Sequence, residues 1–219
     1  MNVFKPMALG LALAAAFSTT AVASDVRHYE VTVTNLTLDQ MFAPIMVGTH
    51  RPGARLFTLG MPASTGLAAV AEGGNPAPLV AEFGANPKVS EVATSAGPVL
   101  PGQTVTIHVM ATDGANRLSL ASMLVNTNDA FVALDSVILP MTMGRTMHTA
   151  VAYDAGSEPN DELCAHIPGP ACRGEGLSAS AGGEGYVRVH EGVHGVGNIS
   201  AAQYDWRNPV AQVTVRRMP

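Results

Sequence analysis

The chain carries little charge, and it lacks several motifs that mark common activities. Asp, Glu, Lys and Arg together make up 13% of its 219 residues, and the formal net charge is −5. So few charges, with a small acidic excess, argue against nucleic acid or an anionic membrane surface as a partner. The sequence also has no phosphate-binding P-loop, no G-x-S-x-G motif, no twelve-residue EF-hand loop and no visible internal repeat.

Cysteine is equally scarce. The two cysteines are Cys164 and Cys172, with seven residues between them. This spacing excludes a C-x-x-C redox site. In an exported protein we expect the pair to form a disulfide that closes a short loop, and two free thiols are the alternative.

The first 23 residues have the pattern of a secretory signal peptide. Lys5 supplies a positive charge, residues 7–17 form a short apolar run, and Ala21-Val22-Ala23 matches an A-x-A cleavage site. The apolar run is too short to span a bilayer comfortably, and no second long apolar run follows it. We therefore expect cleavage after Ala23, no transmembrane span, and a secreted or periplasmic protein with one domain, residues 24–219.

The rest of the chain has the residue pattern of an all-β protein. Apolar and polar residues alternate, or β-branched residues gather, in short segments separated by turn-forming residues. The expected strands are residues 28–34, 44–49, 55–59, 104–110, 117–125, 131–139, 147–153, 185–190 and 208–217. Pro44 favours an edge position for the second of them. About eight to ten strands predict an antiparallel β-sandwich.

Two short helices are expected between the early strands. The first covers residues 64–71 with Ser64 as its N-cap, and the second covers residues 76–83 after Asn75 as its N-cap. Apolar residues recur at helical spacing in both, namely Leu67, Val70 and Ala71, then Leu79, Val80 and Phe83. These faces predict helices that pack on the sheet.

Acidic and amide side chains gather in two turn-like segments, residues 126–129 and 153–162. If the apolar runs beside them are strands of one sheet, the two segments meet at one end of it. Several carboxylate and amide oxygens on bendable loops are what a hard cation such as Ca²⁺ requires. The sequence therefore favours a calcium site there, and ordinary Asp-, Asn- and Gly-rich turns that bind nothing are the alternative.

A second candidate site is the H-E-x-x-H match formed by His190, Glu191 and His194. A zinc protease needs both histidines on one helix face, with the glutamate beside a metal-bound water. Residues 186–189 instead have a strand pattern, and three glycines fall within residues 192–197. Each glycine inside a helix costs about 1 kcal/mol relative to alanine, so the flanking residues favour a polar turn.

Five segments together resemble the spondin N-terminal domain family, from residue 29 to about residue 218. They are YEVTVTNLT (29–37), RLSLASMLV (117–125), TNDAFV (127–132), YDAGSE (153–158) and DWRNPV (205–210). The Ser-Met-Leu-Val, Asn-Asp-x-Phe-Val and Asp-Ala-Gly pieces, in this order, are the most specific.

The resemblance implies a C2-like antiparallel β-sandwich with a calcium ion near one end. The positions that match the family's metal ligands are Asp129, Asp154 and Glu158, and family members often carry aspartate at the last of these. Neighbouring oxygen-bearing residues that are further candidates are Asn128, Asn160 and Asp161. Animal spondins are extracellular-matrix and adhesion proteins with extra repeats that this chain lacks. Their guidance and adhesion roles therefore do not transfer to it.

The leading hypothesis is an exported, non-catalytic, calcium-binding module that contacts another protein or a surface glycan. A metal-dependent hydrolase that uses His190, Glu191 and His194 is the alternative from a different class. A purely structural envelope protein is the third possibility.

Overall fold

The computed structural model describes Met1 and residues 25–112, 114–177 and 182–219. Residues 2–23 of the expected signal peptide lie outside this part of the chain. The described strands are β1 (Arg27–Asn35), β2 (Met46–His50), β3 (Val89–Thr94), β4 (Thr104–Ala111), β5 (Arg117–Met123), β6 (Ala130–Ile138), β7 (Gly144–Asp154), β8 (Arg188–Val189) and β9 (Ala211–Arg217). The helices are α1 (Thr65–Gly73), α2 (Ala77–Gly84), α3 (Ala201–Tyr204) and a 3₁₀ turn, Cys164–His166.

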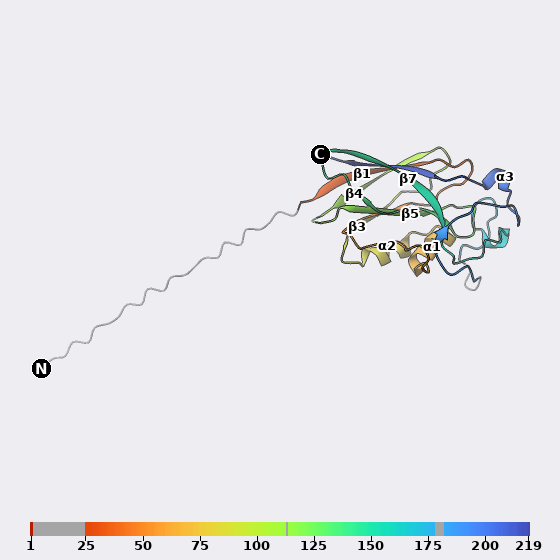
Figure 1. The fold of residues 1–219 in the computed structure, drawn as a ribbon, viewed down its shortest axis with the longest axis horizontal. Coiled ribbons are helices and arrows are strands. Elements are labelled where there is room, and N and C mark those ends of the chain that lie inside the picture. Colours follow the sequence, from red (N-terminus) through yellow and green to blue (C-terminus); the bar gives the residue numbers. More distant parts are fainter. Residues whose placement is uncertain (2–24, 113, 178–181) are drawn as a thin grey trace.

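The strands form an antiparallel sheet that folds over into two layers and nearly closes. Its order is β3-β2-β5-β6-β7-β9-β1-β4, and β8 pairs with β7. The long strand β7 joins the layers, because residues 144–150 pair with β9 while residues 151–154 pair with β6. Figure 1 shows β1 and β4 in one layer, and β3 and β5 in the other. The all-β antiparallel fold expected from the sequence is confirmed.

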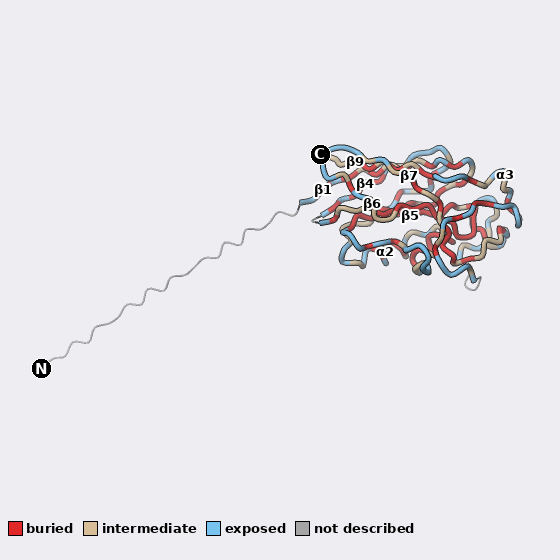
Figure 2. The backbone as a smooth tube through the Cα atoms, in the orientation of Figure 1, coloured by how far each residue is buried: buried red, intermediate tan, exposed pale blue. Residues whose placement is uncertain are grey.

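The larger core lies between the two layers. Alternate residues of β1 are fully buried, which is the pattern of a strand with one face in a core and one facing outward. The core side chains include Val31, Val33, Ile107, Leu118, Leu120, Val132, Val213 and Val215. Figure 2 shows the buried backbone concentrated along these central strands. The alternation of apolar and polar residues in β1 therefore determines which of its side chains face the core.

A second core lies between the helices and the outer face of the other layer. Leu67 and Val70 of α1 and Phe83 of α2 pack there with Phe131 of β6. Figure 1 shows both helices beneath this layer. Both helices were expected, and the Ser64 hydroxyl accepts the expected capping bond from Leu67 N at 3.2 Å.

Because the second layer is covered on both sides, all five residues of β2 are buried. β2 pairs with both β3 and β5, so the edge position predicted from Pro44 is wrong. Pro44 lies before the first residue of the strand, where its missing N–H leaves the ladder intact.

Two expected strands differ from the structure. Residues 55–59 form no strand, because Leu56 N and the Arg55 side chain bond the Asp135 carboxylate instead of a neighbouring backbone. Only Arg188–Val189 of residues 185–190 pair as a strand. The sequence analysis also missed β3, whose residues are partly exposed on both faces and therefore show no clear alternation.

No helix in the described residues is both long enough and apolar enough to cross a membrane.

Candidate metal centre

The two acidic segments meet because β6 and β7 are antiparallel neighbours. Asp129 immediately precedes β6, Asp154 ends β7, and Ala130 is the register partner of Asp154. A further backbone bond, from Ala155 N to Asp129 O at 3.2 Å, closes this end of the pair. The sequence prediction that the two segments lie together at one end of the sheet is therefore confirmed.

Asp129 is fully buried, and its two carboxylate oxygens have different surroundings. Oδ2 accepts hydrogen bonds from Ser157 N at 2.8 Å and Glu158 N at 3.0 Å. Oδ1 is also buried and has no hydrogen-bond partner among the described residues. Burial, followed by the negative charge of Asp154, raises the pKa of Asp129 to about 7. Two acids buried side by side repel each other when both are ionised, so the neutral form of Asp129 is favoured.

Asp154 is equally buried but fully bonded. Its Oδ1 accepts from Gly156 N at 2.7 Å, and its Oδ2 accepts from Asn160 Nδ2 at 2.6 Å. Arg188, its register partner on β8, places Nη2 3.0 Å from the same Oδ2. Burial raises the pKa of Asp154, although Asn160, Gly156 and Arg188 all act in the opposite direction.

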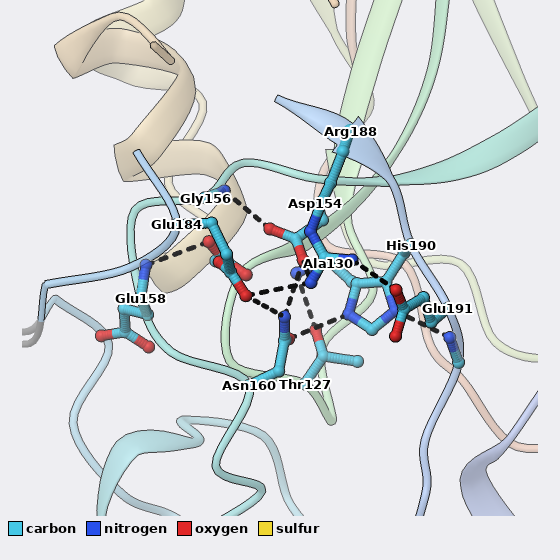
Figure 3. A network of polar contacts seen from close by, with 12 residues as sticks. Thr127, Ala130, Asp154, Gly156, Glu158, Asn160, Glu184, Arg188, His190 and Glu191 are labelled. Atoms are coloured by element: carbon cyan, nitrogen blue, oxygen red, sulfur yellow. Dashed lines mark hydrogen bonds and ion pairs between the residues drawn. The ribbon is translucent and has the colours of Figure 1, made fainter. Parts of the chain in front are cut away.

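The Glu158 side chain does not join these two carboxylates. Its backbone N–H bonds Asp129, but Figure 3 shows its carboxylate pointing away from Asp154. The glutamate whose carboxylate lies beside Asp154 in that view is Glu184, which bonds Arg188 Nη2 at 2.9 Å. The sequence analysis missed Glu184, and the only signal that could have found it is a lone acid within the glycine-rich residues 182–185.

The neighbouring candidates are bonded within the protein. Asn128 bonds Asp161 Oδ1 at 3.0 Å and accepts from Glu162 N, so it ties two loops together. Asp161 Oδ2 lies 2.6 Å from His166 Nδ1. Asn160 points into the site, where its Nδ2 bonds Asp154. Among the described residues, no group of three or more His, Cys, Asp or Glu side chains is arranged to hold a metal ion.

The H-E-x-x-H segment is not helical. His190 follows β8, its Nδ1 accepts from Gly192 N at 2.9 Å, and its Nε2 lies 3.1 Å from Asn160 Oδ1. Glu191 is bonded to Arg188 at 2.9 Å. Because both nitrogens of His190 are engaged, this segment lacks the arrangement of a zinc protease.

A disulfide joins Cys164 and Cys172, as expected from the sequence. The loop that it closes lies against the first acidic segment, where Ala171 N bonds Asn126 Oδ1 at 3.2 Å. A Cβ on Gly169 would come within 2.5 Å of Val125 O, so the two backbones are in close contact. The disulfide therefore secures a neighbour of the Asp129 loop.

Comparison with known proteins identifies the family. A search of curated proteins finds no match. The Spondin_N family model matches residues 26–159, which is more than half of the chain and includes Asp129, Asp154 and Glu158. The matched range ends before Glu184 and Arg188. The chain belongs to the spondin N-terminal domain family.

Proposed function

We propose that this protein is an exported, non-catalytic binding module in which a calcium ion holds the ends of β6 and β7 together. The observation that carries the proposal is the buried Asp129 Oδ1, which has no hydrogen-bond partner among the described residues and lies in a carboxylate next to Asp154. A cation there would offset the charge of two buried acids and satisfy this oxygen.

The donor chemistry fits calcium. Asp129 and Asp154 would hold the ion, and the family resemblance adds Glu158, whose side chain would have to turn to reach them. All these donors are oxygens on loops, and calcium accepts six to eight oxygens in flexible geometry. Magnesium demands a tighter octahedral shell and gives up its water reluctantly, so we expect it to substitute poorly.

Family membership supports the rest of the proposal. Spondin domains are extracellular, non-catalytic modules, and we propose another protein or a surface glycan as the partner. The expected signal peptide would direct export and would be cleaved after Ala23. Mass spectrometry of protein from the native host should give a mature N-terminus at Ser24, and a retained Met1 would contradict export by this route.

The test is the melting temperature of the mature protein with calcium and with chelator, together with its metal content. A ligand that binds only the folded state raises the free energy of unfolding by about 2.7 kcal/mol when its concentration is a hundredfold above Kd. Calcium should therefore raise the melting temperature, and Asp154→Asn should remove most of the rise. An identical melting temperature in calcium and in chelator would show that these loops are ordinary turns.

A further inference from the structure

We propose that the outer face of the layer formed by β7, β9, β1 and β4 binds an anionic glycan through the guanidinium groups of Arg145 and Arg216. The inference rests on the proposed function only in taking the protein as a module that binds a partner. The calcium ion plays no part in it.

The outer face of this layer is directed away from both cores. Along each of its strands, more buried residues alternate with more exposed ones, and the buried residues belong to the core between the layers. The helices α1 and α2 pack on the other layer, and Figure 1 shows them beneath it. The alternate residues that point outward are therefore accessible to a partner.

The strand registers arrange these outward residues in rows that cross the layer. One row consists of Arg145, Arg216, Glu30 and His108, from β7, β9, β1 and β4 respectively. Each of the next two rows contains three threonines and one other neutral residue. These rows are Met147, Thr214, Thr32 and Thr106, then Thr149, Gln212, Thr34 and Thr104. A ligand that lies on this face thus meets one charged row and two rows with many hydroxyl groups.

The charged row has two arginines directly opposite each other. Arg145 and Arg216 are register partners, and such a pairing places Cβ atoms about 4.5–5.5 Å apart, where like charges repel and destabilise the sheet. Glu30 lies on the other side of Arg216 and forms an ion pair with its Nη2 at 3.0 Å. Arg145 is exposed and has no acidic partner among the residues that the structure describes. An anion bound to both guanidinium groups would remove the repulsion between them.

The side chains of this face match the two kinds of group that an acidic sugar carries. A guanidinium binds a carboxylate or a tetrahedral oxyanion through two parallel hydrogen bonds, so uronic-acid carboxylates and sugar sulfates both suit Arg145 and Arg216. A threonine hydroxyl can donate and accept, as the ring hydroxyls of a sugar require. The acidic groups would therefore lie on the arginines and the hydroxyl groups along the threonine rows.

Other anionic partners fit this face less well. Anionic membranes are bound by clusters of about four to eight basic residues, whereas this row has two arginines and one glutamate. Binding in a membrane interface also requires a large apolar face, and Met147 is the single apolar residue of the two neutral rows. The net charge of −5 opposes the long-range attraction on which binding to nucleic acid depends. An anionic glycan is therefore the partner that the face favours.

Binding of the mature protein to immobilised polysaccharides, measured in chelator, tests the inference. The probes are dextran sulfate, polygalacturonate and unmodified dextran, which carry sulfate groups, carboxylate groups and no charge. We expect wild-type protein to bind dextran sulfate, polygalacturonate or both, but not dextran. The comparison of the first two identifies the acidic group that the face prefers.

Two variants with the same change in net charge locate the binding site. Arg145→Gln removes one guanidinium without leaving an acid unpaired, and it should raise the Kd at least about fivefold. Lys88→Gln is the matched control, because Lys88 is exposed and immediately precedes β3 in the other layer. Screening by salt limits the effect of so distant a charge, so this variant should stay within about twofold of the wild-type Kd.

A third variant should change the affinity in the opposite direction. Glu30 accepts hydrogen bonds from Arg216 Nε at 3.2 Å and Nη2 at 3.1 Å, so it competes with an anionic ligand for this guanidinium. Glu30→Gln should therefore lower the Kd about twofold or more, because it removes a negative charge beside the ligand. An unchanged or higher Kd would contradict the role of Arg216.

The remaining outcomes are equally decisive. The inference is wrong if neither anionic polysaccharide binds, or if Arg145→Gln and Lys88→Gln weaken binding equally. Equal or tighter binding of poly-L-glutamate or of phosphatidylserine vesicles would overturn it in favour of an acidic peptide or a lipid surface. If the polysaccharides fail while calcium still raises the melting temperature, the proposed function stands without this inference. The melting temperature of each variant verifies that it is folded.

Discussion

His190 is a buried histidine whose contacts require the neutral ring. Its Nδ1 accepts from Gly192 N, so its Nε2 carries the proton and donates to Asn160 Oδ1. The ring also lies 5.0 Å from that of Trp206, between their centroids. Burial lowers the pKa of His190 to about 4, and the positive charges of Arg188 and His194 act in the same direction. A second proton on Nδ1 would face the N–H of Gly192.

This histidine should make folding stability depend on pH. Its folded pKa lies below the unfolded value of 6.5, so its contribution is present above pH 6.5 and is lost as the pH falls toward 4. Between pH 7 and pH 5, wild-type protein should lose about 2 kcal/mol more than His190→Gln, by urea unfolding in chelator. The raised pKa of Asp129 increases stability as the pH falls, but this contribution is present in both proteins and cancels in the comparison. Equal losses of unfolding free energy in the two proteins would contradict the prediction. As a control, the free energies of unfolding of the two proteins should change in parallel between pH 7 and pH 8.

At the scale of elements, the Asp154 turn after β7 depends on glycine. Gly156 has a φ of 65°, and its missing Cβ leaves room for the backbone of Tyr186. Gly102 has a similar φ of 70°, but nothing lies within 4 Å of where its Cβ would be. Both glycines have a left-handed backbone conformation, but only Gly156 is closely packed. Substitutions at the two positions therefore distinguish the cost of the conformation from the cost of the packing.

Replacing each glycine with alanine should measure the two effects. Gly102→Ala should lower the free energy of unfolding by about 1–2 kcal/mol, the cost of a left-handed conformation. Gly156→Ala should cost clearly more because its Cβ would collide with the backbone of Tyr186, and it should also reduce the calcium-dependent rise in melting temperature because it displaces the turn that follows Asp154. Chemical denaturation in chelator and in calcium measures both. Equal losses in the two variants would mean that the loops do not pack closely.

The same elements show what the sequence can and cannot predict. Alternation located β1 and β4, and the Ser64 cap located α1, because these signals depend on local chain geometry and on one buried face. The meeting of Asp129 and Asp154 was predictable from two strands that pair. Glu184 was not, because a short two-residue strand and a glycine contact between distant loops place it there. Residues 55–59 were wrongly predicted to be a strand for a related reason, because the distant Asp135 side chain of β6 bonds their polar groups.

At the scale of the whole molecule, the acidic segments and the disulfide lie at the same end of the sandwich. The disulfide loop contacts Asn126, which lies three residues before Asp129. The long segment from Asp154 to β8 contains one 3₁₀ turn among its described residues and is held mainly by such contacts. A covalent link between Cys164 and Cys172 reduces the freedom of this segment in the unfolded chain.

The disulfide should therefore stabilise the protein independently of calcium. For a loop closed by residues 8 apart, the chain-entropy estimate is about 2–3 kcal/mol, which Cys164→Ser/Cys172→Ser should lose in guanidinium unfolding. A reducing agent should lower the stability of wild-type protein by a similar amount and leave the double variant unchanged, which is the matched control. Both proteins should keep the rise in melting temperature with calcium, because neither sulfur belongs to the cation site. Denatured wild-type protein from the exported fraction should show no reactive thiols, and titration of two thiols there would contradict both the bond and the oxidising compartment that it requires.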